Sequence, residues 1–374
     1  MESLRSDETP PRTAGVVSRT VRLSDAPRPR DALSAADPPR TFWAAPGEAT
    51  VVGSGAAATI RADGPDRFRI VRRAAEELFS SGDVHAGTLA ARPRLFGGFA
   101  FHDEHTGEGP WEGYPGAKFV LPRRQATYVD GDVWLTVNAV GEAPETVERR
   151  LREARETVQG SLPSESIGEP PGIDTRTRTT SKAEWREGVT AATDRIETGG
   201  LRKVVLAQAL RVSLSSRLSI PDVLTRLGET YPDCYRFLFE PDDGTGGFFG
   251  ATPERLVDLR GRTVETGALA GTTGRGETPE EDEWLAEELL ADEKNAHEHE
   301  LVVGAVRKQL EPHAASIRTG ARRIRRLATV QHIETPIAAE LATDEHVLTL
   351  VEALHPTPAV GGLPPDRALA TIRD

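Results

Sequence analysis

The residue whose type and position most suggest chemistry is Lys203, which opens the aliphatic run KVVLAQALRV. Only five of the 46 lysines and arginines are lysines, so this chain normally uses arginine as its cation. Arginine keeps its proton in proteins, whereas a lysine removed from water can lose its proton near neutral pH and act as a base. In a strand, Lys203 would share a face with the small apolar side chains of Val205, Ala207 and Ala209. Lys203 is therefore a candidate base, and a strand-end lysine that reaches solvent is the alternative interpretation.

A candidate acid, Glu254, lies between apolar segments in FFGATPERLVDL. If it is buried, its carboxyl holds a proton to higher pH and can serve as a general acid. If it is exposed beside Pro253, it is an ordinary surface carboxylate. A base and an acid whose pKa values both move toward neutrality form the pattern expected of an enzyme that transfers two protons.

A candidate metal ligand, Glu298, lies in the segment DEKNAHEHE. A carboxylate that faces a core must be paired or must bind a metal, and a lone oxygen ligand suits Mg²⁺, which keeps several waters. His297 and His299 suggest a transition metal instead, but residues two apart on a helix point in nearly opposite directions, which disfavours zinc. The apolar residues that place Glu298 on an inward helical stripe follow it by three, four and seven positions: Leu301, Val302 and Ala305.

Two stretches rich in glycine, threonine and proline could bind an anionic ligand. They are ETGALAGTTGRG (265–276) and LHPTPAVGGLP (354–364). Tight turns there allow backbone N–H groups to approach a ligand, although ordinary loops have the same composition. His332, in LATVQHIETPI, has apolar neighbours and is either a site residue or a hydrogen-bonded core histidine.

The elements that must position these residues can be predicted from capping and periodicity. Asp130-Gly131 between alternating apolar residues predicts a β-hairpin, and Gly261 predicts a turn between two strands. Separate hairpins and helices favour an α+β fold with antiparallel sheets over a doubly wound parallel sheet. Helices are predicted over 66–82, 144–160, 181–200, 219–232 and, as one long helix, 278–314.

The composition along the chain predicts four parts. Residues 1–40, rich in Pro, Arg, Ser and Asp, are expected to be poorly ordered. Residues 41–160 form an N-terminal α/β part, and 161–180 read as a linker. Residues 181–374 form a second part that carries all the candidate site residues.

The overall charge and cysteine content limit the class of protein. A net charge of −12 argues against nucleic acid and anionic membrane surfaces as partners. The single cysteine, Cys234, rules out an internal disulfide framework and suits a reducing cytoplasm. No apolar stretch approaches the roughly 18 residues of a membrane span, and the first residues lack the apolar region of a secretory signal. We therefore expect a soluble protein of the cytoplasm.

Six stretches together resemble the chorismate-utilising enzymes, and most closely the isochorismate synthases, which are related to anthranilate synthase component I. They occur in the family's order, at similar spacing, from about residue 180 to 374, with weaker likeness in LFGGFAF and KFVLPR. The resemblance implies an α/β/β/α sandwich of two large antiparallel-rich sheets with helices outside. The six stretches are KVVLAQ, FGATPERL, ALAGTTGRG, DEKNAHEHELVV, LATVQHIETPI and LHPTPAVGGLP.

The resemblance also implies a role for each candidate residue. Lys203 falls on the lysine that activates water for attack at C2 of chorismate, and Glu254 falls on the acid that protonates the departing C4 hydroxyl. Glu298 falls on a glutamate that holds Mg²⁺, which binds the substrate carboxylate, and His332 matches a site histidine. Two loops then fall beside the substrate ring and near its carboxylates: Ala270, Gly271 and Thr272, and Ala359, Val360 and Gly361.

Two positions predict which relative this chain is most similar to in activity. Anthranilate synthases, which use ammonia, typically have glutamine at the position of Lys203, and aminodeoxychorismate synthases have a nucleophilic lysine at the position of Ala270. The resemblance therefore implies water as the nucleophile and a Mg²⁺-dependent isochorismate synthase, an isomerase of menaquinone or siderophore biosynthesis and a monomer. A salicylate synthase and a truncated, non-catalytic paralogue that binds chorismate are the alternatives.

The end of the chain departs from the family's pattern. Relatives continue beyond the IRD-like segment for tens of residues, which carry further strands, an arginine and a second magnesium glutamate. This chain stops at Asp374. On this basis we expect a fragment or a truncated gene product, with weaker Mg²⁺ binding and unpaired sheet edges.

Overall fold

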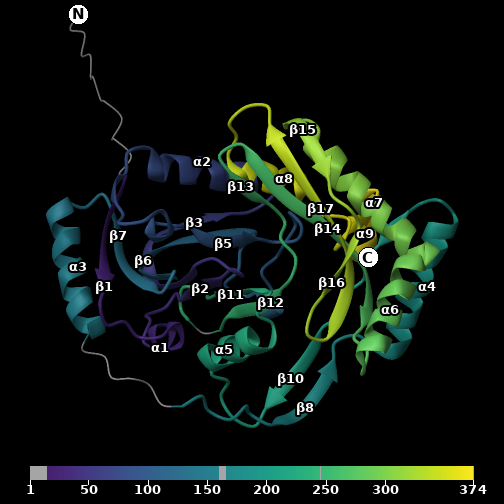
Figure 1. Cartoon of the computed structure of the whole chain (residues 1–374), viewed down its shortest axis with the longest axis horizontal. Coiled ribbons are helices and arrows are strands. Elements are labelled where there is room, and N and C mark those ends of the chain that lie inside the picture. Colours follow the sequence, from purple (N-terminus) through teal and green to yellow (C-terminus); the bar gives the residue numbers. More distant parts are fainter. Residues whose placement is uncertain (1–14, 160–165, 245, 374) are drawn as a thin grey trace, which may run out of the picture. The chain divides into compact units, whose positions relative to one another are not determined.

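The computed structural model describes residues 15–159, 166–244 and 246–373. The chain divides into two compact units, each of which is described by itself (Figure 1). The first unit contains Met1–Ala100, Glu104–Ser164 and Phe237–Phe249. The second contains Phe101–Asp103, Glu165–Arg236 and Gly250–Asp374.

The first unit is built on a nine-stranded sheet in the order β12-β11-β2-β3-β6-β7-β1-β4, with β5 paired to β6. Strand β1 pairs with β4 in parallel. The pairs β1-β7, β2-β3, β3-β6, β5-β6 and β6-β7 are antiparallel. Its strands are β1 (Val16–Leu23), β2 (Thr41–Ala44), β3 (Thr50–Ala62), β4 (Asp83–His85), β5 (Phe96–Phe99), β6 (Ala117–Val129), β7 (Asp132–Val140), β11 (Tyr235–Phe239) and β12 (Phe248–Thr252). Its helices are α1 (Pro29–Ser34), α2 (Arg67–Ser80), α3 (Pro144–Gln159) and the 3₁₀ turns η1 (Leu89–Ala91) and η2 (Gly109–Trp111).

Local sequence explains the best-defined hairpin of this unit. Asp130 and Gly131 both have positive φ, at 51° and 80°, which is the conformation of a two-residue turn that matches the twist of the flanking strands. The turn joins β6 to β7, as the sequence predicted. The face of β7 and β1 behind it packs against α3 through Val17, Val137 and Val147.

The second unit contains a five-stranded sheet in the order β13-β14-β17-β15, with β16 paired to β17, and all of its pairs are antiparallel. Two short two-stranded sheets, β10-β8 and β18-β9, accompany it. The strands are β8 (Ile173–Arg178), β9 (Lys203–Val204), β10 (Leu210–Leu214), β13 (Asp258–Arg260), β14 (Thr263–Gly274), β15 (Ala314–Thr319), β16 (Arg323–Arg326), β17 (Val330–Leu341) and β18 (Gly362–Leu363). The helices are α4 (Lys182–Glu197), α5 (Ile220–Thr230), α6 (Pro279–Ala291), α7 (Glu293–Leu310), α8 (Val347–Leu354) and α9 (Pro365–Arg373).

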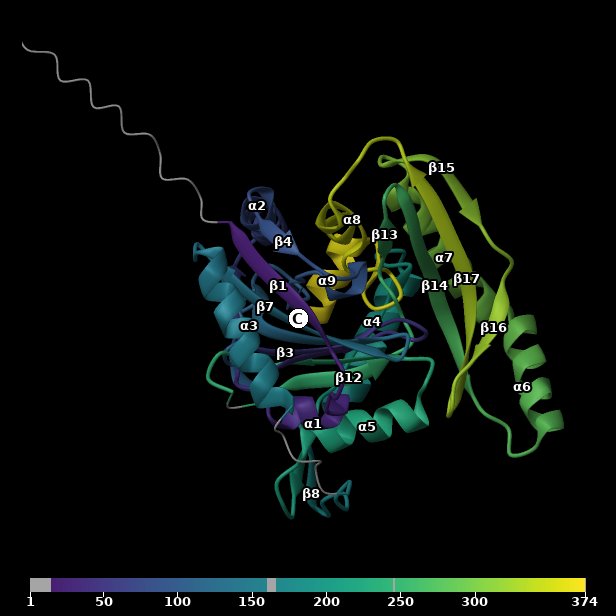
Figure 2. The same cartoon turned by 60° about the vertical axis from the view of Figure 1, so that its left-hand side comes forward.

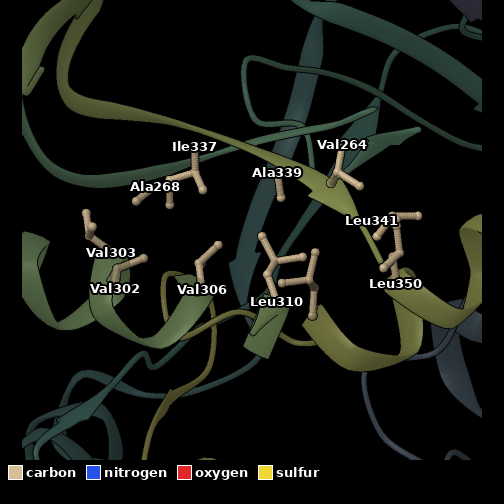
Figure 3. Packing of buried hydrophobic residues seen from close by; sticks show 11 residues of the cluster. Val264, Ala268, Val302, Val303, Val306, Leu310, Ile337, Ala339, Leu341 and Leu350 are labelled. Carbon is tan, nitrogen blue, oxygen red and sulfur yellow. The ribbon is translucent and has the colours of Figure 1, made fainter. Parts of the chain in front are cut away.

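Helix α7 covers one face of this sheet, behind β14 and β17 in Figure 2. Every second residue of β17 is buried on that face, as a half-buried strand requires. Figure 3 shows the α7 side chains pointing toward the strands, with α8 closing the end of the core. The core residues are Val264, Ala268, Val302, Val303, Val306, Leu310, Ile337, Ala339, Leu341, Leu350 and Leu354.

The sequence predicted a poorly ordered segment over residues 1–40, and this is wrong for residues 15–40, which the structure describes. Residues 16–23 form β1, in which Val16 is fully buried, and residues 29–34 form α1. The apolar alternation of VVSRTVRL outweighs the Pro- and Arg-rich composition around it, because the strand gains hydrogen bonds from β4 and β7. Residues 1–14 lie outside the described part.

Three other predictions are corrected by the structure. The linker expected over 161–180 contains β8, although residues 160–165 lie outside the described part, and residues 237–249 group with the first unit rather than the second. The long helix expected over 278–314 is two helices, because Asp292 leaves helical geometry and its side chain accepts a hydrogen bond from the Asn295 N–H at 2.7 Å. The strand expected from Lys203 onward is only two residues long.

Candidate active site

Lys203 is held by the loop that precedes β18. Its Nζ donates to the Pro358 carbonyl at 2.8 Å and, at 3.5 Å, to that of Ala359. Beside it, the Val205 N–H donates to the Gly361 carbonyl at 2.8 Å. The short ladder of β9 and β18 therefore brings two of the predicted site segments together, although they are about 150 positions apart in the sequence.

The electrostatic surroundings of Lys203 match those of a base. Burial lowers the pKa of its ammonium, whereas the nearby carboxylates of Glu298 and Glu254 raise it, and the net shift is downward. The desolvation predicted from the sequence is present, but it comes from this loop and not from Ala207 and Ala209, which are exposed. A neutral amine has two N–H groups for the two carbonyls and keeps its lone pair free to accept a proton.

Glu254 has the complementary shift. Burial raises the pKa of its carboxyl, and the charge of Lys203 lowers it by less. It follows β12 in a turn where its own N–H donates to the Thr252 hydroxyl at 3.2 Å. Among the residues that the structure describes, its carboxyl has no hydrogen-bond partner. A lysine and a glutamate with pKa values displaced toward each other therefore occur together in one unit.

Glu254 also lines a cavity of about 490 Å³. The walls include Gly267 and Leu269 of β14 and Glu334 and Pro336 of β17, which lie on the sheet face opposite α7. Cavities of this size hold small-molecule ligands. The cavity wall also contains four arginines, of which Arg255, Arg323 and Arg325 form ion pairs with Asp258, Glu265 or Glu334; the fourth is Arg318.

His332 lies on that same sheet face and is half-buried. Its Nδ1 is 2.8 Å from the hydroxyl oxygen of Thr272, its partner across the ladder. Burial lowers the pKa of the imidazole, and Arg325 lowers it further, while a backbone hydrogen bond with Gly271 raises it. His332 is thus an imidazole oriented by Thr272, with its pKa held below the ordinary value. In the described part of the chain, no hydrogen bond or ion pair joins it to Lys203 or Glu254.

The loop residues Ala270, Gly271 and Thr272 are part of β14 and form a bulge in it. The ladder with β17 changes register between Leu269 and Thr272. Gly271 has φ +89°, a conformation that only glycine adopts at little cost, and a Cβ there would lie 3.0 Å from the Ile333 Cδ1 atom. The sequence predicted a ligand loop here, and the structure shows a strand whose bulge reaches the site histidine.

Glu298 is half-buried on α7, close enough to Lys203 for their charges to interact. Of the three apolar residues that predicted an inward position for it, Leu301 and Val302 are buried and Ala305 is half-buried, and Glu298 lies at the edge of this buried face. The buried residues of α7 are His299, Leu301, Val302, Val303, Val306 and Leu310.

His299 is a functional candidate that the sequence reasoning considered only as a metal ligand. It is fully buried, with Nδ1 3.1 Å from the Ala270 carbonyl and Nε2 2.7 Å from the Thr335 hydroxyl. Burial lowers the pKa of the imidazole. Its spacing from Val302 and Val306 in the sequence was the available signal that it faces the core.

The residues present can be tested against a metal ion. His297 is exposed and both ring nitrogens of His299 are engaged, so the two histidines do not form a transition-metal pair. Within the described residues, no group of three or more histidine, cysteine or acidic side chains could hold a metal. Glu298 supplies one hard oxygen ligand, which fits Mg²⁺, because that ion keeps several waters and takes further oxygens from a substrate.

Lys118, in the first unit, shows that a lowered lysine pKa does not by itself identify a catalytic base. It is buried, which lowers its pKa to about 8. However, its Nζ forms an ion pair with Asp242 at 3.0 Å, and no acid with a raised pKa accompanies it in the described residues. The pairing of base and acid, rather than the lysine pKa, distinguishes Lys203.

With regard to a membrane, the described helices include none that is both long and apolar enough to span one. The α+β fold with large antiparallel sheets, predicted from the sequence, is confirmed.

Comparison with known proteins identifies the family. Isochorismate synthase MenF of Bacillus subtilis is 30% identical over 346 residues, which are 90% of this chain and 73% of that protein. The salicylate biosynthesis isochorismate synthase of Pseudomonas aeruginosa is 32% identical over 350 residues, or 90% of this chain and 70% of that protein. The solved structure of MenF, the menaquinone-specific isochorismate synthase from Escherichia coli, has a TM-score of 0.78 at 25% identity and covers 96% of this chain and 79% of that one. The profile of the family described as chorismate binding enzyme matches residues 8–374, and this chain therefore belongs to that family.

Proposed function

We propose that this protein is an isochorismate synthase that converts chorismate to isochorismate with water as the nucleophile. The observation that carries the proposal is the pairing of Lys203, whose pKa is lowered by burial, with Glu254, whose pKa is raised by burial. Two curated isochorismate synthases match 90% of the chain and support the same activity.

The two groups account for both proton transfers of the reaction. The lone pair of Lys203 takes a proton from water as the water oxygen bonds to C2 of chorismate. The two conjugated double bonds of the ring each shift by one position, the C4–O bond breaks, and Glu254 donates its proton to the departing hydroxyl, which leaves as water. One water enters and one leaves, so the reaction is an isomerisation, and exchange of a proton between Lys203 and Glu254 through solvent restores the starting state.

Glu298 is the residue that would hold Mg²⁺. The ion, when bound, would neutralise charge on a substrate carboxylate. The Glu298 carboxylate also interacts with Lys203, so it stabilises the ammonium that forms when the base takes its proton.

The remaining predicted residues bind and orient the substrate in this proposal. The bulge of Ala270, Gly271 and Thr272 lies beside the ring, and His332, oriented by the Thr272 hydroxyl, faces the reacting carbons. The loop of Ala359, Val360 and Gly361 contributes backbone groups near the carboxylates. Its hydrogen bonds to β9 place that backbone directly beside the base.

The test is chromatography of chorismate incubated with the purified chain, with Mg²⁺ and with EDTA. We expect isochorismate that depends on Mg²⁺, and no pyruvate. Lys203→Met should abolish the product, whereas Lys308→Met, which changes an exposed lysine of α7, should not. A folded chain with no turnover refutes the proposal, and stoichiometric pyruvate would identify a salicylate synthase instead.

A further inference from the structure

The bulge in β14 determines the direction in which Thr272 points. Leu269 pairs with Glu334, and Thr272 pairs with His332, so Ala270 and Gly271 together oppose Ile333. Side chains alternate along a strand, so a regular strand would place Thr272, three residues after Leu269, on the face of α7. The extra residue returns Thr272 to the face of His332, and the 2.8 Å contact between their side chains depends on it.

A bulge also leaves backbone groups without partners in the ladder. Ala270 has no residue of β17 to itself, because it shares Ile333 with Gly271, and it is half-buried where it packs against the core beside α7. An unpaired carbonyl in such a place costs the free energy of a lost hydrogen bond. His299 supplies the missing partner, with its Nδ1 at 3.1 Å.

The partners of His299 fix its tautomer. A carbonyl oxygen can only accept, so Nδ1 must carry the proton that is donated to Ala270. In the neutral ring Nε2 is then an acceptor, and it takes the hydroxyl proton of Thr335 at 2.7 Å. Thr335 lies on β17, two residues from Ile333, so His299 connects α7 with both strands at the bulge.

We propose that His299 is a positioning residue that holds the β14 bulge in register and thereby keeps Thr272 directed at His332. The inference rests on the proposed function for its kinetic consequence, because Thr272 and His332 act on the substrate in that proposal. His299 follows Glu298 directly, so one turn of α7 presents a carboxylate to the base and anchors the bulge.

Three variants separate positioning from general stability. His299→Leu keeps the volume and removes both hydrogen bonds, whereas His299→Asn places an amide N–H near the position of Nδ1 and can still donate to Ala270. Thr335→Val is the matched control, because it removes the hydrogen bond at Nε2 and leaves the one to Ala270. A misplacement of about 1 Å lowers turnover by roughly 100-fold. We therefore expect kcat of His299→Leu to fall by about 10- to 100-fold. His299→Asn and Thr335→Val should keep most of the activity. Each variant is assayed well below its own melting temperature.

Two measurements do not depend on turnover. In His299→Leu, amide hydrogen exchange should be faster than in the unmodified protein in peptides covering residues 268–274. In Thr335→Val, exchange in the same peptides should be unchanged. Nitrogen NMR of the imidazole should show a proton on Nδ1 of His299. The inference is overturned if His299→Leu folds with normal kcat and normal exchange, if His299→Asn and His299→Leu are equally impaired, or if Nε2 carries the proton. If the unmodified chain does not turn over chorismate, the proposed function fails, and exchange and NMR still decide the role of His299.

Discussion

Gly362 offers the sharpest test of the contact between β9 and β18. A Cβ at this position would lie 2.3 Å from the carbonyl oxygen of Lys203, 2.7 Å from the Ala368 Cβ and 2.9 Å from the Val204 Cα, where ordinary contacts are 3.4–4 Å. Gly362→Ala therefore requires the two strands to separate by about 1 Å, because the nearest atom belongs to the backbone and cannot rotate away. The residue also has φ +154°, which disfavours any side chain.

The effects on stability and turnover can be estimated separately. Backbone strain at an unfavourable φ costs about 1–3 kcal/mol, and each weakened hydrogen bond costs about 1 kcal/mol. For a unit of this size, each kcal/mol lowers the melting temperature by about 2–4 °C. The same separation moves the carbonyls of Pro358 and Ala359 away from the Lys203 amine. A displacement of about 1 Å should reduce kcat/KM by roughly 100-fold.

Gly361→Ala is the matched control. Its new Cβ would meet its nearest neighbours at 3.4 Å, the Thr357 carbonyl oxygen, and 3.5 Å, which are ordinary contacts, and its φ is not positive. Thermal unfolding and steady-state turnover of chorismate should therefore show a large loss for Gly362→Ala and a small one for Gly361→Ala. Equal behaviour of the two variants would refute the claim that close approach of the strands sets the position of Lys203.

Three further predictions concern the acid, an ion pair and the core. Glu254→Gln keeps the size of the side chain but cannot give up a proton, so kcat should fall by about 100-fold or more while the melting temperature stays the same or rises, since a buried ionisable group is removed. Hydrogen bonding by Arg275 lowers the pKa of Asp282 from 3.8 to about 2, so this contact stabilises the folded state above pH 3.8 and is lost as the pH falls through 2. Acid unfolding should therefore lose its steepness in that range in Asp282→Asn. Leu310→Ala removes a fully buried side chain between α7 and its sheet and should lower the free energy of unfolding by about 2–5 kcal/mol in urea titration.

Each of these predictions has an outcome that contradicts it. Normal turnover of Glu254→Gln would remove the residue from the role of acid. An acid-unfolding curve of Asp282→Asn that superimposes on that of the unmodified protein would mean that the Arg275 contact also persists in the unfolded state. A loss below about 1 kcal/mol in Leu310→Ala would mean that the core collapses around the vacated space.

The parts of the fold that the sequence predicted are those decided by local chemistry. The capping box of Ser181 and Glu184 starts α4 as expected, with the two hydrogen bonds at 3.2 and 2.8 Å. Thr278 caps α6 with its hydroxyl alone, which accepts a hydrogen bond from the Glu281 N–H at 3.2 Å. The hairpin at Asp130-Gly131 follows from positive φ at two adjacent residues. Each of these signals needs only the residues within one turn of the chain.

The parts that the sequence missed depend on distant partners. Lys203 was recognised as unusual by its type, but the groups that desolvate it come from residues 358 and 359. The break at Asp292 could have been read from its capping relation to Asn295, but strong helical periodicity on both sides concealed it. The role of His299 depends on a bulge in another element, and no pattern in DEKNAHEHE indicates where a carbonyl lacks a partner.

The bulge in β14 also affects how this strand can change in evolution. On the first part of the strand the residues that face the cavity are odd-numbered, and after the bulge Thr272, which is even-numbered, faces the same way. Deleting Gly271 would remove the bulge and leave a regular strand, in which Thr272 would follow Leu269 by two positions and would still face the cavity. The bulge is therefore a one-residue insertion that the strand absorbs locally, so that the side chains beyond it keep the faces they would have in a regular strand.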